Sequence, residues 1–112
     1  MTAHDLPNRI VWDDLIRRRT VARAQMDLAY ASGEPESVTD QLNDKHAAAL
    51  DACLLTPAGC LADVRAKLEL IDDWDIADGW WCAQEAIAIL ALDAKRLLPV
   101  DHNERLATEG AA

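Results

Sequence analysis

The residues from 56 to 98 constrain the fold most, because they place a short acidic break between two stretches with helical spacing. Apolar residues recur every three or four positions in the first stretch, at Leu61, Val64, Leu68 and Ile71. This is the spacing of one face of an α-helix. A turn with four aspartates occupies positions 72–79, and an Ala- and Leu-rich stretch then continues to Pro99. These residues therefore predict a helix, a tight turn and a longer helix.

The first half of the chain repeats helical spacing twice. A helix is predicted over residues 10–32, with Gly33 as its stop and Trp12 at the edge of its apolar stripe. A second helix is predicted to start at Ser37, which would cap it together with Asp40. The expected apolar stripes are Val11, Leu15, Ala22, Met26 and Ala29 on the first helix, and Val38, Leu42, Ala49 and Cys53 on the second.

The four stretches together predict an all-α fold. We expect a small four-helix domain made of two consecutive antiparallel helical hairpins. Residues 1–9 are expected to form a loose N-terminal arm, 10–99 the single helical domain and 100–112 a flexible C-terminal tail. Thr56 and Asp78 are the expected N-caps of the third and fourth helices. With no Phe, four Gly and four Pro, a fold of short strands joined by Gly- and Pro-rich turns is poorly supported.

The charge of the chain is strongly negative and unevenly distributed. Its formal net charge is −9, and residues 34–93 hold thirteen acidic and three basic side chains. A surface of this kind repels nucleic acid, so direct nucleic-acid binding is not expected. The short basic cluster at positions 17–19 and 23 is expected to offset nearby acids. The acidic surface is expected to include Asp40, Asp44, Asp51, Asp72, Asp73 and Asp75. It either attracts a basic protein surface or keeps the protein soluble.

No residue pattern predicts a cofactor, a metal site or a catalytic site. Cys53 and Cys60 are seven positions apart, whereas zinc sites use closely paired ligands. An EF-hand loop starting at Asp73 would place Ala77 and Gln84 at ligand positions, which they cannot fill. No serine or cysteine has a base and an orienting group near it in sequence. We expect a protein that is not an enzyme, with Cys53, Cys60 and Cys82 reduced.

The chain shows no targeting or membrane signal. Its N-terminus has neither a basic start nor an apolar core segment. The longest unbroken apolar run covers seven residues, 86–92, far fewer than a membrane span needs. A cytoplasmic location is therefore expected, and reduced cysteines agree with it.

The predicted fourth helix is apolar on two opposite sides. One side is an ordinary core stripe, made of Trp80, Ala83, Ile87, Leu90, Ala94 and Leu97. The opposite side holds Trp81, Glu85, Ala88, Ile89, Leu92 and Arg96. A helix of this kind is either central in its own domain, here covered by the first helix, or in contact with another chain. In the second case the partner-binding residues are Trp81, Glu85, Ile89, Leu92 and Arg96.

One segment of the chain resembles a group of known sequences. The run TPAGCLADVRAKLEL, a Trp-Asp step and the long Ala/Leu helix after it are similar to short uncharacterised helical proteins of alphaproteobacterial genomes and their prophages. The resemblance covers roughly residues 50–98 and leaves out the positions of Cys60 and Cys82. It implies an all-α fold and a bacterial or phage source, and it carries over no functional residues.

Two main interpretations of function follow. The first is a non-enzymatic protein–protein interaction module that uses the fourth helix to bind another protein, a homodimer being one form of it. The second is an acidic phage-type inhibitor, of the anti-defence or anti-CRISPR kind, that mimics nucleic acid and binds a basic surface of a host protein. An enzyme or a metal-dependent protein ranks last. Salt separates the first two, because mimicry of a phosphate backbone weakens steeply as ionic strength rises.

Overall fold

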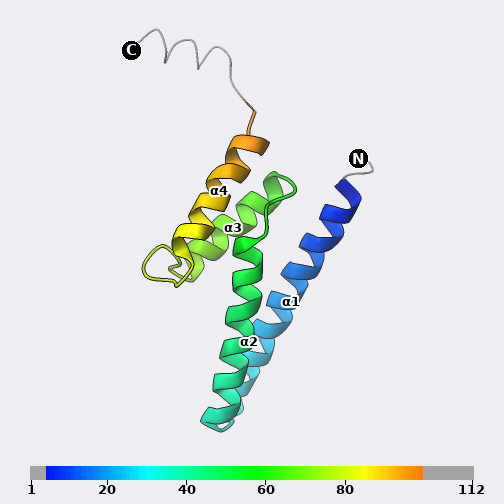
Figure 1. Cartoon of the computed structure of the whole chain (residues 1–112). Coiled ribbons are helices and arrows are strands. Elements are labelled where there is room, and N and C mark those ends of the chain that lie inside the picture. The colour runs from blue at the N-terminus through cyan, green and yellow to red at the C-terminus, as the bar shows by residue number, and fades with distance from the viewer. Residues whose placement is uncertain (1–4, 100–112) are drawn as a thin grey trace.

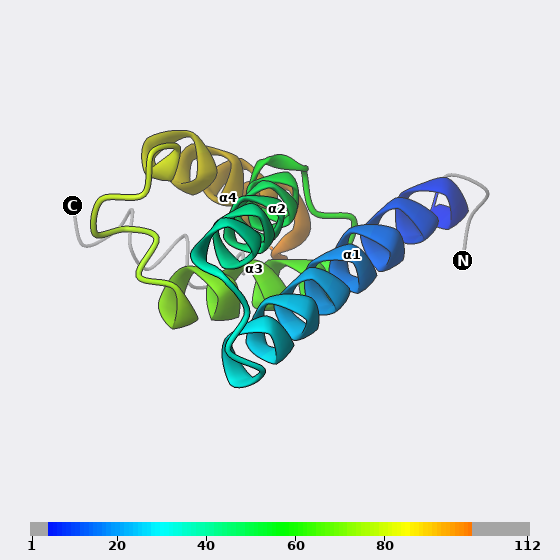
Figure 2. The same cartoon turned by 90° about the horizontal axis from the view of Figure 1, so that it is seen from below.

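Four α-helices account for most of the described residues of the computed structural model, which cover 5–99, with side chains described from residue 11 onward. They are α1 (Asp5–Ala31), α2 (Glu36–Leu55), α3 (Leu61–Asp73) and α4 (Ala83–Leu97). Between residues 5 and 99 no strand forms. α1 and α2 form a long antiparallel hairpin, and α3 and α4 also run in opposite directions (Figures 1 and 2). The predicted all-α fold of two consecutive hairpins is confirmed.

The ends of the first helix differ in how well the sequence predicts them. α1 begins at Asp5, so residues 5–9 are helical rather than part of a loose arm. Its end agrees with the prediction, because Gly33 has a φ of 68° and a glycine adopts this left-handed conformation without steric cost. Residues 1–4 of the predicted arm and the predicted tail at 100–112 lie outside the described residues.

The three predicted N-caps are wrong. α2 begins directly after Pro35 with no side-chain cap, so Ser37 lies inside the helix. Thr56 ends α2 instead of capping α3, and its hydroxyl donates to the carbonyl of Ala52 at 2.7 Å. Cys60 and Cys82 precede α3 and α4, which leaves Asp78 in the turn. For α3 the physical reason is that the α2–α3 loop is bound by Asp93 of α4 and Asp63 of α3, which accept from the backbone N–H groups of Ala58 and Gly59. The helix therefore starts only after this loop.

The core forms where all four helices meet around α2. Its buried residues come from every helix and from the α3–α4 turn: Trp12, Leu50, Cys53, Leu54, Leu70, Ile76 and Ala86. Trp12 is only 1% exposed, and its indole N–H donates to the carbonyl of Pro57 at 2.7 Å. The prediction that Trp12 lies at the edge of a stripe is therefore wrong, because this residue joins α1 to the loop between α2 and α3.

The buried faces of α2 and α3 are rotated from the predicted stripes. On α3 the predicted stripe residues Leu61 and Leu68 are 46% and 52% exposed. Val64 on α3 and Cys53 on α2 are buried as predicted. The other buried residues lie outside the predicted stripes: Asp63, Lys67 and Leu70 on α3, and Thr39, His46, Leu50 and Leu54 on α2. Apolar spacing alone misplaced these faces because it leaves Asp63, Lys67 and His46 out of the buried stripes.

An ion pair buried between α3 and α4 accounts for the orientation of both helices. Lys67 Nζ lies 2.5 Å from Asp93 Oδ2, and both side chains are 1% exposed. Asp93 also accepts from the backbone N–H of Ala58 at 3.0 Å and from Arg96 Nη2 at 2.8 Å. Burial raises the pKa of Asp93, but hydrogen bonds from Lys67, Arg96 and the Ala58 amide outweigh it and hold that pKa below its ordinary value. At neutral pH Asp93 is therefore ionised in the folded protein.

Leu68 and Leu70 form a matched pair for testing the orientation of α3. We expect Leu70→Ala to destabilise the fold by about 2–5 kcal/mol, because it leaves a cavity in the core. Leu68→Ala should cost less than about 1 kcal/mol, since the side chain is half exposed. Urea denaturation followed by circular dichroism measures both. Equal losses would contradict the orientation described here.

Removal of one partner tests the buried ion pair. Lys67→Met should cost about 3–5 kcal/mol at pH 7, because Asp93 would keep a buried charge with less compensation. Lys45→Met removes an exposed lysine and serves as the control. In the wild type, the contribution of Asp93 should be complete above pH 3.8, its ordinary pKa, and lost as pH falls through the lower folded pKa. A Lys67→Met protein as stable as the control would contradict this assignment.

Candidate interaction surface on the fourth helix

Five exposed residues form a stripe along one side of α4 and the turn before it. We call this stripe the α4 outer face, and it consists of Trp81, Glu85, Ala88, Leu92 and Lys95. Trp81 is 74% exposed and Leu92 is 64% exposed. α1 does not cover them, because it lies on the opposite side of α2 from α4 in both views (Figures 1 and 2). Of the two explanations that the sequence left open, burial under the first helix does not apply to these residues.

The opposite side of α4 is held by core contacts. Ala86 packs in the core and is 1% exposed, Cys82 is buried, and Asp93 is bound to Lys67 and to the α2–α3 loop. These three residues lie within a narrow sector of the helix at 100° per residue. The sector on the other side is consequently turned to solvent.

The exposed indole of Trp81 is oriented by a carboxylate of α2. Asp51 accepts from Trp81 Nε1 at 2.9 Å and from Trp80 Nε1 at 2.7 Å, one indole at each carboxylate oxygen. The thiol of Cys82 lies 3.7 Å from Oδ1, the oxygen that accepts from Trp80. Asp51 was predicted to belong to the outward acidic surface. It is instead half-buried, and it contacts three consecutive residues of the turn just before α4.

Two predicted partner-binding residues are partly used by the fold itself. Ile89 is half-buried. Arg96 donates from both terminal nitrogens to the carbonyl of Ala58, at 3.0 and 2.9 Å, and from one of them to Asp93. Ile87, predicted for the core stripe, is 45% exposed. The outer face is thus rotated slightly from the predicted one, with Lys95 replacing Ile89 and Arg96.

The other predicted acidic residues are exposed. Asp40, Asp44, Asp72, Asp73 and Asp75 all have exposed side chains, and within residues 11–99 none of these carboxylates forms an ion pair. Three arginines of the basic cluster form ion pairs within α1. Arg17 and Arg18 pair with Asp14, and Arg23 pairs with Asp27.

The cysteines and His46 do not form a reactive or metal-binding group. No disulfide joins Cys53, Cys60 and Cys82, and Cys53 and Cys82 are buried. Burial raises the pKa of both of these thiols, which disfavours the reactive thiolate. His46 packs against Trp74 with ring centroids 4.6 Å apart. In the described part of the chain, no three His, Cys, Asp or Glu side chains lie together in a way that could hold a metal ion.

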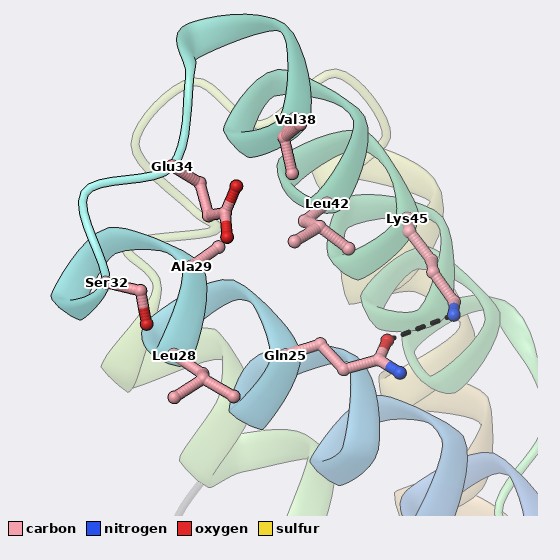
Figure 3. Close-up of a pocket in the computed structure, with 8 residues that line it drawn as sticks. All are labelled: Gln25, Leu28, Ala29, Ser32, Glu34, Val38, Leu42 and Lys45. Carbon is pink, nitrogen blue, oxygen red and sulfur yellow. Dashed lines mark hydrogen bonds between the residues drawn. The ribbon is translucent and has the colours of Figure 1, made fainter.

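A shallow hollow lies near the tip of the α1–α2 hairpin, and no sequence pattern predicted it. It has a volume of about 430 Å³ and is open to solvent (Figure 3). Leu28, Val38 and Leu42 line it together with polar residues, and Lys45 Nζ donates to Gln25 Oε1 at 3.0 Å across it. Its one lysine is therefore already paired, and the hollow shows no group of converging polar side chains of the kind that orients a small ligand.

No model of a known protein family, no curated protein and no solved structure matches this chain. Between residues 5 and 99, no helix combines the length and the apolar character needed to cross a membrane.

The buried imidazole of His46 should make stability depend on pH. Burial lowers its pKa from 6.5, and the charges of Arg19 and Arg23 lower it further. Its Nε2 atom is buried without a hydrogen-bond partner. An unfolded histidine therefore takes up a proton at higher pH than the folded one. Stability should be complete above about pH 6.5 and fall as pH drops through the folded pKa, by at most about 1.4 kcal/mol per pH unit.

His46→Phe tests this dependence, because it keeps a ring beside Trp74 without a titrating group. Urea denaturation between pH 7.5 and 5 should show a smaller slope for the variant than for the wild type. An unchanged slope would contradict a neutral, buried His46.

Proposed function

We propose that this chain is a non-enzymatic protein–protein interaction module, and that the α4 outer face is its contact surface. The observation that carries the proposal is Trp81, which is 74% exposed yet held in one orientation by Asp51. A large apolar side chain in this position gains nothing from exposure. Tryptophan is among the residues that contribute most to protein–protein interfaces.

The energetics of the outer face favour binding. Burial of a large apolar side chain such as Leu92 contributes about 1.5–3 kcal/mol, and Trp81 has a still larger surface. Ordering a flexible side chain at an interface costs about 0.5–1.5 kcal/mol. The hydrogen bond to Asp51 has already restricted the indole, so part of this cost is met before a partner arrives. The charged groups of Glu85 and Lys95 lie between the apolar residues and provide orientation rather than affinity.

The exposed carboxylates support a second candidate function. Asp72, Asp73 and Asp75 lie close together at the end of α3 and in the next turn, without ion-pair partners among the described residues. An acidic inhibitor that mimics nucleic acid would use such groups against a basic channel of a host protein. Its binding would weaken steeply between 50 and 300 mM salt, whereas binding through Trp81 and Leu92 would change little.

The substitution Trp81→Asp tests the proposed surface. Because Trp81 is exposed, the variant should keep its helical circular dichroism and a similar melting temperature. It should lose association, measured both as self-association by sedimentation and as capture of other proteins by the immobilised chain. Leu28→Asp adds the same charge at a residue of α1 that is 67% exposed, and it should associate as the wild type does.

Two results would contradict the proposal. One is unfolding of Trp81→Asp, which would make this residue part of the core. The other is a folded variant that associates as well as the wild type. Retained binding that disappears at high salt would favour the acidic inhibitor.

A further inference from the structure

We infer that the partner of the α4 outer face is a second copy of this chain, bound through an antiparallel pairing of the two α4 helices. This inference rests on the proposed function and names the partner of the same surface. It derives from the order of the side chains along the face. When a second copy of the face runs antiparallel to the first, side chains of opposite charge or of complementary size lie opposite one another.

The outer face has the spacing of a coiled-coil seam. Its residues are separated alternately by four and three positions, from Trp81 through Glu85, Ala88 and Leu92 to Lys95. This 3.5-residue spacing is the one that keeps a seam of side chains against a second helix. All five residues are exposed, and α4 lies on the side of α2 away from α1 (Figure 2), so nothing from α1 obstructs a second helix there.

Charge complementarity selects the register. In an antiparallel pair centred on residue 90, Glu85 lies opposite the partner's Lys95, and by symmetry Lys95 lies opposite the partner's Glu85. Both pairs are of opposite sign. In the same pairing Ala88 lies opposite the partner's Leu92, so that a small residue faces a large one and the helices approach closely. Trp81 lies opposite the partner's Pro99, an exposed residue just past the end of α4. Each layer of the seam is therefore either charge-paired or apolar.

Other arrangements of the same face are less favourable. A parallel pair in register places Glu85 opposite the partner's Glu85 and Lys95 opposite the partner's Lys95, which brings like charges together. An antiparallel pair shifted by one heptad toward the N-terminus places Trp81 opposite the partner's Leu92 but Glu85 opposite the partner's Ala88. It leaves a carboxylate against an apolar side chain, and no residue of the partner's α4 lies opposite Lys95. The sequence of the face thus favours one orientation and one register.

The resulting dimer should dissociate readily. α4 has 15 residues and is about 22 Å long at 1.5 Å per residue. A contact limited to two helices of this length is smaller than the interfaces of permanent dimers, which bury more than about 2,000 Å². The net charge of −9 also opposes the approach of a second copy. We therefore expect a monomer–dimer equilibrium that depends on protein concentration.

Exchange of the two charges tests the register. Sedimentation velocity over a range of concentrations should show that Glu85→Lys and Lys95→Glu each weaken dimerisation about tenfold or more, because each places like charges in both symmetric pairs. The double variant Glu85→Lys, Lys95→Glu should recover dimerisation to within about threefold, since it restores both pairs in reverse. An equimolar mixture of the two single variants should form a mixed dimer for the same reason. Circular dichroism checks that each variant is folded.

Matched substitutions elsewhere control for net charge. Glu36→Lys at the start of α2 and Lys45→Glu on α2 change the charge by the same amounts at exposed positions, and both should dimerise as the wild type does. The double variant has the same net charge as the wild type, so its recovery depends on position alone.

Three outcomes would overturn the inference, and they can be told apart from failure of the proposed function. A wild-type chain that stays monomeric at millimolar concentration excludes the second copy. If Trp81→Asp still abolishes capture of another protein in that case, the proposed function stands and only the partner differs. A double variant no better than the single ones excludes the antiparallel register. A dimer that Trp81→Asp leaves intact places the contact elsewhere and removes the proposed function as well.

Discussion

The buried ion pair between Lys67 and Asp93 is the interaction on which the rest of the structure depends. It joins α3 to α4, and through the hydrogen bonds of Asp93 and Arg96 to Ala58 it also joins both helices to the loop after α2. A buried pair of this kind contributes little net stability, because desolvation offsets the attraction between the charges. Its effect is on geometry. Any rotation of α3 or α4 that separates the two groups would leave a buried charge without a partner, which costs several kcal/mol.

The orientation of α4 has a direct consequence for the surface. Once Asp93 and Ala86 face the core, Trp81, Glu85, Ala88 and Leu92 face solvent. α2 contributes a second constraint through Asp51, whose two carboxylate oxygens accept from the indoles of Trp80 and Trp81. The same helix thus supplies the centre of the core and the group that orients the exposed tryptophan. A substitution that changes the packing of α2 would therefore change the orientation of Trp81, although α2 contributes no residue to the outer face.

The core tolerates an unusual share of polar groups for its size. Thr39, His46, Asp63, Lys67 and Asp93 are all buried. Two of them are bound locally: the Thr39 hydroxyl donates to the carbonyl of Glu36, and Asp63 accepts from the N–H of Gly59. Lys67 and Asp93 bind each other across α3 and α4. Such groups favour one arrangement of the helices over alternatives with similar apolar burial, because each alternative would leave one of them unpaired. In a chain rich in alanine, different helix arrangements bury similar apolar surface. The pairing of buried polar groups therefore contributes more to the choice among them.

The sequence alone determined the helical fold class, the number of helices, the break at Gly33 and the apolar character of the fourth helix, since all of these follow from local spacing and from residue conformation. It could not determine the rotation of each helix. Leu68 and Leu70 are two positions apart and chemically identical, and only contacts with other helices decide which of them is buried. The roles of Trp12, Asp51 and Asp93 were equally hidden, because each depends on a partner 26 or more positions away. Local patterns record which residues favour a helix, whereas the pairing of buried polar groups, which exists only in the folded chain, decides which way the helix faces.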